Sequence, residues 1–182
     1  MITANKISPP DNQICQCDIF KDIQIIEDIQ VADTQLHQKS IIFPYVICLN
    51  QECDLLTDSR NRLNVGTDII KDSALLHLAV APVFVFELFK EGKHWGNIFN
   101  AQPLGKKNLE KIEQNEISRY HYLKFAENAF PDMIIDFKHF FSINRNFLYK
   151  NISKRVYSFA PLYKEKISQR FSFYISRIGL PD

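Results

Sequence analysis

The stretch FPYVICLNQECDLLTDSR, Phe43 to Arg60, joins an apolar run directly to a row of polar and reactive side chains. The apolar part belongs to a segment from Ile41 to Leu49 that is dense in β-branched and aromatic residues, which predicts a strand. This strand would end in two amides, two carboxylates and a thiol instead of the usual Gly or Pro. The five residues are Asn50, Gln51, Glu52, Cys53 and Asp54.

If the strand alternation continues through this row, Gln51 and Cys53 share one face and Asp54 lies on the other. At a strand end that faces a cleft, the amide would orient a ligand, and the thiol or the carboxylate would react with it. A plainer interpretation also fits. In that interpretation Cys53 is a small buried hydrophobic residue, and Asp54 or Asn50 binds backbone amides in the next turn.

The composition is typical of a globular domain. The chain has 182 residues, of which 46% are hydrophobic and 24% charged, and this length fits one domain. Fifteen Phe and seven Tyr favour a strand-rich core. The net charge of +1 creates no global attraction to nucleic acid or membranes, although residues 138–177 hold nine Lys or Arg and one Glu.

Targeting signals are not evident. No N-terminal stretch has the pattern of a signal peptide, and the longest apolar run is too short to span a bilayer. We therefore expect a cytoplasmic protein without a membrane partner, and its four cysteines are expected to be free thiols.

The rest of the sequence predicts short strands around a polar insertion. Residues 90–116 are polar and are interpreted as an inserted flap, with a short helix from Lys106 to Gln114. Pro82 predicts an edge or a bulge within its strand. The further strands are expected at Asp18–Val31, Ala74–Phe89, Ser118–Phe125, Met133–Phe137 and Phe140–Leu148.

A closing helix is the clearest element. Ser158 is suited to cap it, Pro161 to occupy its first turn, and Tyr163, Ile167 and Phe171 recur at helical spacing. With residues 1–17 as a loose arm, we expect a single domain over residues 18–182. Its class is β-dominated α+β, most simply a small curled sheet or barrel.

Two further sets of residues are candidates for binding an anionic substrate. Arg119 and His121 share one strand face, where a cation and an acid/base group would serve cleavage at a phosphate. Lys166, Arg170 and Arg177 line one face of the closing helix and would track phosphates. Both sets also fit solvated faces of ordinary elements.

Several classes of chemistry are unlikely from the motifs. The sequence has no Gly-rich phosphate loop, no HExxH, no Gly-x-Ser-x-Gly and no dinucleotide fingerprint. Cys15 and Cys17 are separated by one residue, whereas paired zinc ligands favour two to four. We therefore expect neither a metal nor a cofactor.

The order of segments resembles that of the MazF/PemK-like toxins. IIFPYVICLN (41–50) looks like the strand carrying their Arg-Pro-x-Val-Val pattern, and ALLHLAVAPVFV (74–85) like their next core strand. PDMIIDFKHFFSIN (131–144) is similar to a later strand pair, and FAPLYKEKISQRFSFYI (159–175) to their closing helix. Over about residues 18–178, the resemblance implies an SH3-like barrel, usually dimeric, in a family of sequence-selective ribonucleases. Phe43 stands where the family pattern has Arg, and Val83 near its Thr, so no catalytic residue of the family is carried over.

The leading hypothesis is a PemK/MazF-like protein of a toxin–antitoxin or phage-defence system that binds RNA as a metal-independent endoribonuclease. Arg119 would stabilise phosphate charge, His121 would act as acid or base, and Asp54 with Gln51 would position the substrate. The protein partner would be an antitoxin or another defence component, and the chain itself a homodimer. The alternative is a non-catalytic protein-interaction module. The enzyme requires Arg119, His121 and Asp54 in one open cleft, whereas the module predicts them dispersed beside an exposed aromatic patch.

Overall fold

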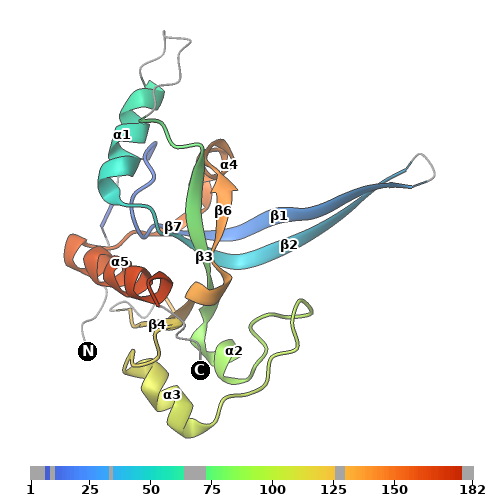
Figure 1. Cartoon of the computed structure of the whole chain (residues 1–182), viewed down its shortest axis with the longest axis vertical. Helices are drawn as coiled ribbons and strands as arrows, with labels where there is room; N and C mark the ends of the chain where they lie inside the picture. Colours follow the sequence, from blue (N-terminus) through green and yellow to red (C-terminus); the bar gives the residue numbers. More distant parts are fainter. Residues whose placement is uncertain (1–6, 9–10, 33–34, 64–72, 126–129, 178–182) are drawn as a thin grey trace.

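The computed structural model describes residues 7–8, 11–32, 35–63, 73–125 and 130–177, and its fold is α+β (Figure 1). Seven strands form one antiparallel sheet. The strands are β1 (Ile19–Ala32), β2 (Gln35–Cys48), β3 (His77–Val85), β4 (Tyr120–Leu123), β5 (Met133–Asp136), β6 (Phe141–Asn144) and β7 (Arg155–Tyr157). The helices are α1 (Glu52–Leu63), α2 (Phe86–Lys90), α3 (Lys106–Glu113), α4 (Arg145–Lys150) and α5 (Pro161–Ile175), with 3-10 turns η1 (Phe137–His139) and η2 (Ile152–Lys154).

The central strand of the sheet is β3. The strand order is β4-β5-β3-β2-β1-β7, and β6 pairs with the first part of β3. The expectation of an edge or bulge at Pro82 is met in part: β2 pairs with β3 at this residue, but among the described strands the other side of β3 has no partner there. On its other side β3 pairs with β6 over residues 77–80 and with β5 over residues 83–85. Pro82 lies between these two partners, where a missing N–H breaks no ladder.

The prediction of a barrel is wrong, because the sheet does not close: within the described ranges, its end strands β4 and β7 do not pair with each other. Instead, much of the hairpin leaves the sheet. β1 and β2 have 14 residues each, but β7 pairs with β1 only at Ile19 and Phe20, and β3 pairs with β2 only over residues 45–48. Residues 23–32 and 35–44 pair with each other in a two-stranded ribbon, here called the arm. Ile23 and Phe43 at its base are buried in the body, and beyond them the ribbon projects from it (Figure 1).

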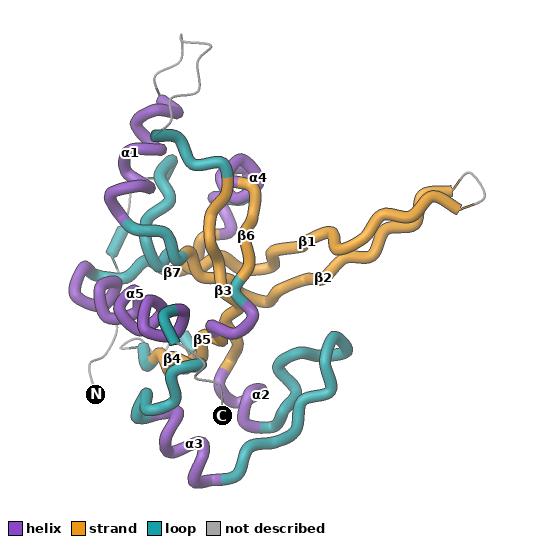
Figure 2. The backbone as a smooth tube through the Cα atoms, viewed as in Figure 1, coloured by secondary structure: helices purple, strands orange, loops and turns teal. Residues whose placement is uncertain are grey.

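Two apolar cores lie on opposite faces of the sheet, and alternation along β2 sorts residues between them. Val46 and Cys48 belong to the first core, whereas Ile47 and Leu49 belong to the second. Residues of α1, α2, α3 and α4 complete the first core. The second core is closed by α5 (Figure 2). The Tyr163 and Ile167 side chains of this helix are buried in the core.

Other expectations are met in part. The helix predicted at Lys106 to Gln114 is α3, and the predicted closing helix is α5, although Ala160 and not Ser158 is its N-cap. The loose arm expected over residues 1–17 is wrong for residues 14–17, which are buried, while residues 1–6 and 9–10 lie outside the described ranges. None of the helices that the structure describes has the length and apolar character needed to cross a membrane.

Candidate functional site

The base of the arm borders an open cavity of about 350 Å³, here called the arm-base pocket. This volume lies within the range of about 300–1,000 Å³ that is usual for binding pockets. Its walls come from the arm, from the loop between α2 and α3, and from η1 and β6. Figure 2 shows that the arm and this loop extend from the same side of the body. The lining residues are Ile25, Glu27, Ile41, Phe43, Trp95, Phe99, His139, Phe141 and Ser142.

Aromatic rings pack edge to face around Trp95, which is buried. Its ring lies 4.9 Å from that of Phe99 and 4.7 Å from that of His139, measured between centroids. The Phe43 and Phe141 rings stack at 4.9 Å. These contacts hold the walls in place, whereas Phe99 keeps 49% of its surface exposed. The pocket is therefore a formed apolar site with one accessible aromatic wall.

A buried ion pair lies behind this pocket. Arg119 donates from Nε to Asp136 Oδ1 at 2.8 Å and from Nη2 to Oδ2 at 2.6 Å, while Asp136 is fully buried. This bidentate arrangement fixes both side chains. The His139 Nε2 atom is 3.9 Å from Asp136 Oδ2, too far for a hydrogen bond. Arg119 is therefore committed to a carboxylate of its own chain.

The two histidines near the pocket are kept uncharged. Burial lowers the pKa of His94 to about 4, and its Nδ1 atom is buried without a hydrogen-bond partner. Burial, aided by the charges of Arg119 and Lys138, also lowers the pKa of His139, although Asp136 opposes this effect. Near neutral pH both imidazoles are neutral and contribute mainly as flat rings.

His121 lies on the opposite face of the sheet from the pocket. Within β4, His121 and Leu123 share the face that α5 covers, so His121 is only 1% exposed. The expectation that Arg119 shares this face is wrong, because Arg119 precedes β4 and its guanidinium binds Asp136 behind the pocket. Burial lowers its pKa to about 3, and both ring nitrogens are buried without partners. An imidazole in this state has no access to a substrate.

The polar row after Leu49 does not continue the strand, contrary to the alternation expected there, because α1 begins at Glu52. Asn50 ends β2 by accepting a hydrogen bond from the Ala79 backbone N–H at 2.7 Å, and the Leu55 N–H donates to the Gln51 carbonyl at 3.2 Å. Cys53 and Asp54 are exposed in the first turn. The Cys53 thiol lies 3.6 Å from Gln51 Oε1 and from Asp54 Oδ1. Gln51, Cys53 and Asp54 thus form one local exposed group, which does not include Arg119 or His121.

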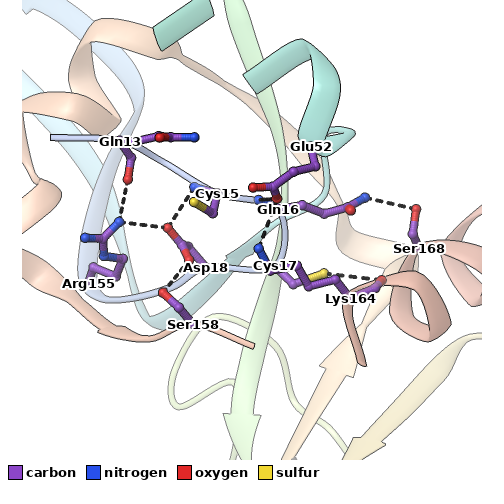
Figure 3. A network of polar contacts seen from close by, with 10 residues as sticks. All are labelled: Gln13, Cys15, Gln16, Cys17, Asp18, Glu52, Arg155, Ser158, Lys164 and Ser168. Carbon is purple, nitrogen blue, oxygen red and sulfur yellow. Dashed lines mark hydrogen bonds and ion pairs between the residues drawn. The ribbon is translucent and has the colours of Figure 1, made fainter. Parts of the chain in front are cut away.

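Glu52, which starts α1, ties three segments together (Figure 3). Its Oε2 atom accepts from the Gln16 backbone N–H at 2.8 Å and from Lys164 Nζ of α5 at 3.1 Å. The Gln16 side chain in turn donates to Ser168 Oγ at 3.2 Å. Within the polar row, Glu52 therefore has a structural role, because it fixes both the N-terminal segment and the closing helix.

A second part of the same network surrounds Asp18, which is fully buried (Figure 3). Its carboxylate accepts hydrogen bonds from the Ser158 hydroxyl, from the Cys15 backbone N–H at 2.8 Å and from Arg155 Nη1 at 3.1 Å. The Ser158 hydroxyl, which the sequence predicts as the cap of α5, therefore binds Asp18 and does not cap the helix. Burial, with the charges of Asp18 and Glu52, raises the pKa of Cys15 to about 12. The thiol is held in its unreactive form.

The basic residues predicted on α5 are divided between solvent and their own chain. Lys166 is exposed. Arg170 Nη2 donates to the Ile117 and Tyr120 carbonyls at 3.0 and 2.9 Å. Arg177 places its guanidinium 4.2 Å from the Tyr174 ring centroid and donates to Ser118 Oγ at 3.3 Å. Arg170 and Arg177 therefore secure the segment before β4.

The residues of the arm-base pocket were not singled out from the sequence. The signal was present in the expected flap at 90–116, where Trp95 and Phe99 stand among polar residues and glycines. No group of three His, Cys, Asp or Glu with metal-binding geometry occurs among the residues that the structure describes. Comparison of the chain with protein-family models, curated proteins and solved structures finds no match.

Proposed function

We propose that this chain is a non-catalytic protein-interaction module that contacts its partner through the arm-base pocket. One observation carries the proposal: an open, aromatic-lined pocket of about 350 Å³ is formed at the base of a projecting arm. The dispersal of Arg119, His121 and Asp54 agrees with it. The module hypothesis expected this dispersal together with an exposed aromatic patch; in the pocket Phe99 is 49% exposed, while Trp95 and Phe43 are buried.

The pocket suits a large apolar or aromatic side chain of a partner protein. Buried anchor residues in well-packed pockets supply most of the binding energy in protein interfaces. Trp95 forms a fixed wall, and the exposed half of Phe99 gives the anchor a ring to pack against. The rim groups Glu27 and Ser142 offer hydrogen bonds to the partner backbone. Such an anchor would bind without any chemical step.

The ribonuclease hypothesis receives less support from the geometry. Cleavage by Arg119 and His121 requires an accessible imidazole, and His121 is buried under α5. The resemblance to MazF/PemK-like toxins, with its SH3-like barrel, remains a prediction about ancestry. Under it, the partner of this module would be an antitoxin or another component of a defence system. RNA binding or cleavage is therefore an outcome that the experiment must include.

The experiment starts from peptides selected on the intact protein from a random library. Their binding is followed by the fluorescence of Trp95, which is the single tryptophan and lies in the pocket. We expect selected peptides to share an aromatic or large aliphatic residue, and Phe99→Asp to weaken their binding at least tenfold. Leu162→Asp is the matched control, because Leu162 is 83% exposed on α5, away from the pocket.

A mixed RNA pool is incubated with the same proteins in parallel. RNA cleavage by the wild type would overturn the module proposal. It would also be overturned if no peptide binds and both the wild type and Phe99→Asp bind RNA equally well. Selected peptides that bind Phe99→Asp as tightly as the wild type would show that the pocket is not the contact surface.

A further inference from the structure

The arm carries an apolar face on the side opposite the arm-base pocket. Directly opposed residues of two antiparallel strands point to the same side, and the register pairs Gln24 with Ile42, Ile26 with Ser40 and Ile29 with Gln38. The hydrogen bond from Gln24 Nε2 to Ser40 Oγ at 2.9 Å confirms the shared side. We call this surface the isoleucine face: Gln24, Ile26, Ile29, Gln38, Ser40 and Ile42.

Three isoleucines on this face are exposed to solvent. Ile26 is 50% exposed, Ile29 54% and Ile42 59%. A two-stranded ribbon is only marginally stable by itself in water, and contiguous exposed apolar residues mark interaction surfaces. An arm that extends roughly 30 Å from the sheet therefore favours a partner that packs on it.

Charge is distributed unequally between the two sides of the arm. Among the side chains that the structure describes, the isoleucine face has no charged member. The charged residues lie on the pocket side, where Lys39 Nζ is 3.0 Å from Glu27 Oε2 and Asp28 is opposite Lys39 in the register. Two isoleucine faces can therefore meet without like-charge repulsion or the burial of an unpaired charge.

The base of this face continues into a second cavity of about 480 Å³. Ile26 from the arm, Ile143 from β6 and Phe147 from α4 form the apolar part of this groove, which would receive an isoleucine from another arm. Its polar side includes Asn144, Asn151 and Lys154, whose Nζ atom donates to the Asp22 carbonyl at 2.8 Å. One molecule thus presents both the projecting apolar side chains and a groove that accepts them.

We propose that a second copy of this chain packs on the isoleucine face, with the two arms antiparallel around a two-fold axis. Because the same surface carries both halves of the contact, the association is isologous and closes at two copies. This inference rests on the proposed function as a protein-interaction module and names one of its partners. The arm-base pocket, on the other side of the ribbon, stays open for a different protein.

The contact area places the dimer in a size class. The isoleucine face spans residues 24–29 of β1, roughly 20 Å, and is about 10 Å wide, so it offers on the order of 200 Å² per copy before the groove is added. Stable complexes bury about 800 Å² per partner, so this interface is in the weak class. The dimer should therefore dissociate at micromolar concentrations.

Sedimentation equilibrium of the full chain from about 5 to 300 µM tests the proposal. We expect a reversible monomer–dimer equilibrium that Ile29→Glu and Ile42→Glu each weaken at least tenfold. Ile175→Glu is the matched control, since Ile175 on α5 is 55% exposed and Ile29 is 54% exposed. It should leave the dimer unchanged.

Circular dichroism melting establishes that each variant is folded, and Ile29→Ser serves as a milder version of the same test. A wild type that is monomeric at every concentration would overturn the proposal. A dimer that Ile29→Glu, Ile42→Glu and Ile175→Glu affect equally would overturn it too. Peptide binding that depends on Phe99 is measured separately, so loss of the dimer would leave the proposed function intact.

Discussion

His121 offers a decisive test of the buried-histidine geometry. Its pKa is about 3 in the folded protein, against an ordinary value of 6.5, because burial disfavours the charged imidazole. Protonation therefore favours the unfolded chain. The stabilisation is fully present above about pH 6.5 and is lost as the pH falls toward 3. A difference of about 3.5 in pKa corresponds to roughly 5 kcal/mol over the whole range.

The experiment compares the free energy of unfolding of the wild type and His121→Leu by urea denaturation at several pH values. Carboxylates also titrate in this range, but they contribute similarly to both proteins and cancel in the difference. Between about pH 7.5 and 4.5, the wild type should lose about 2–3 kcal/mol more than the variant. Leu is apolar and similar in size, so the variant should stay within about 1.5 kcal/mol of the wild type at the higher pH.

Leu162→Ala supplies the control, since Leu162 does not titrate and is 83% exposed on α5, so it should leave the pH dependence of unfolding unchanged. Parallel curves for the wild type and His121→Leu would refute the reasoning. They would mean that the imidazole is accessible to solvent, as an acid/base catalyst needs to be.

Three further outcomes are expected. Arg119→Ala should lower the free energy of unfolding by about 2–4 kcal/mol, measured by urea denaturation, because it removes the charged partner of the buried Asp136 carboxylate and leaves the Lys138 backbone N–H as its donor. Cys53 should react first with a thiol reagent near neutral pH, whereas Cys15, whose burial raises its pKa to about 12, should react only on unfolding. Gly92→Ala should destabilise the protein by about 2 kcal/mol or more, measured by thermal melting, because Gly92 has a φ of +73° and an added Cβ would lie 2.6 Å from a backbone carbonyl oxygen.

These outcomes have their own controls. Lys166→Ala removes an exposed cation and should change the free energy of unfolding by less than about 0.5 kcal/mol. An Arg119→Ala protein as stable as Lys166→Ala would contradict the buried ion pair. Equal reactivity of Cys53 and Cys15 would contradict the packing of the N-terminal segment. An unchanged melting temperature for Gly92→Ala would show that the loop bearing Trp95 and Phe99 is not held as described.

Several elements were predictable because their signals are local. Dense β-branched residues gave the strand that ends near Leu49, and helical spacing gave α5. The start of α1 could also have been recognised. Glu52 and Asp54 in its first turn and Arg60 and Arg62 in its last turn match the helix dipole, a pattern that strand alternation does not explain.

By itself, the sequence determined which side chains share a face within a strand, such as His121 and Leu123 along β4. The tertiary structure decided what covers each face. It placed α5 over His121, paired Arg119 with Asp136 from the neighbouring strand, and brought Trp95 and Phe99 under the arm. The reason is physical: periodicity is set by the backbone over a few residues, whereas burial and pairing depend on segments more distant along the chain.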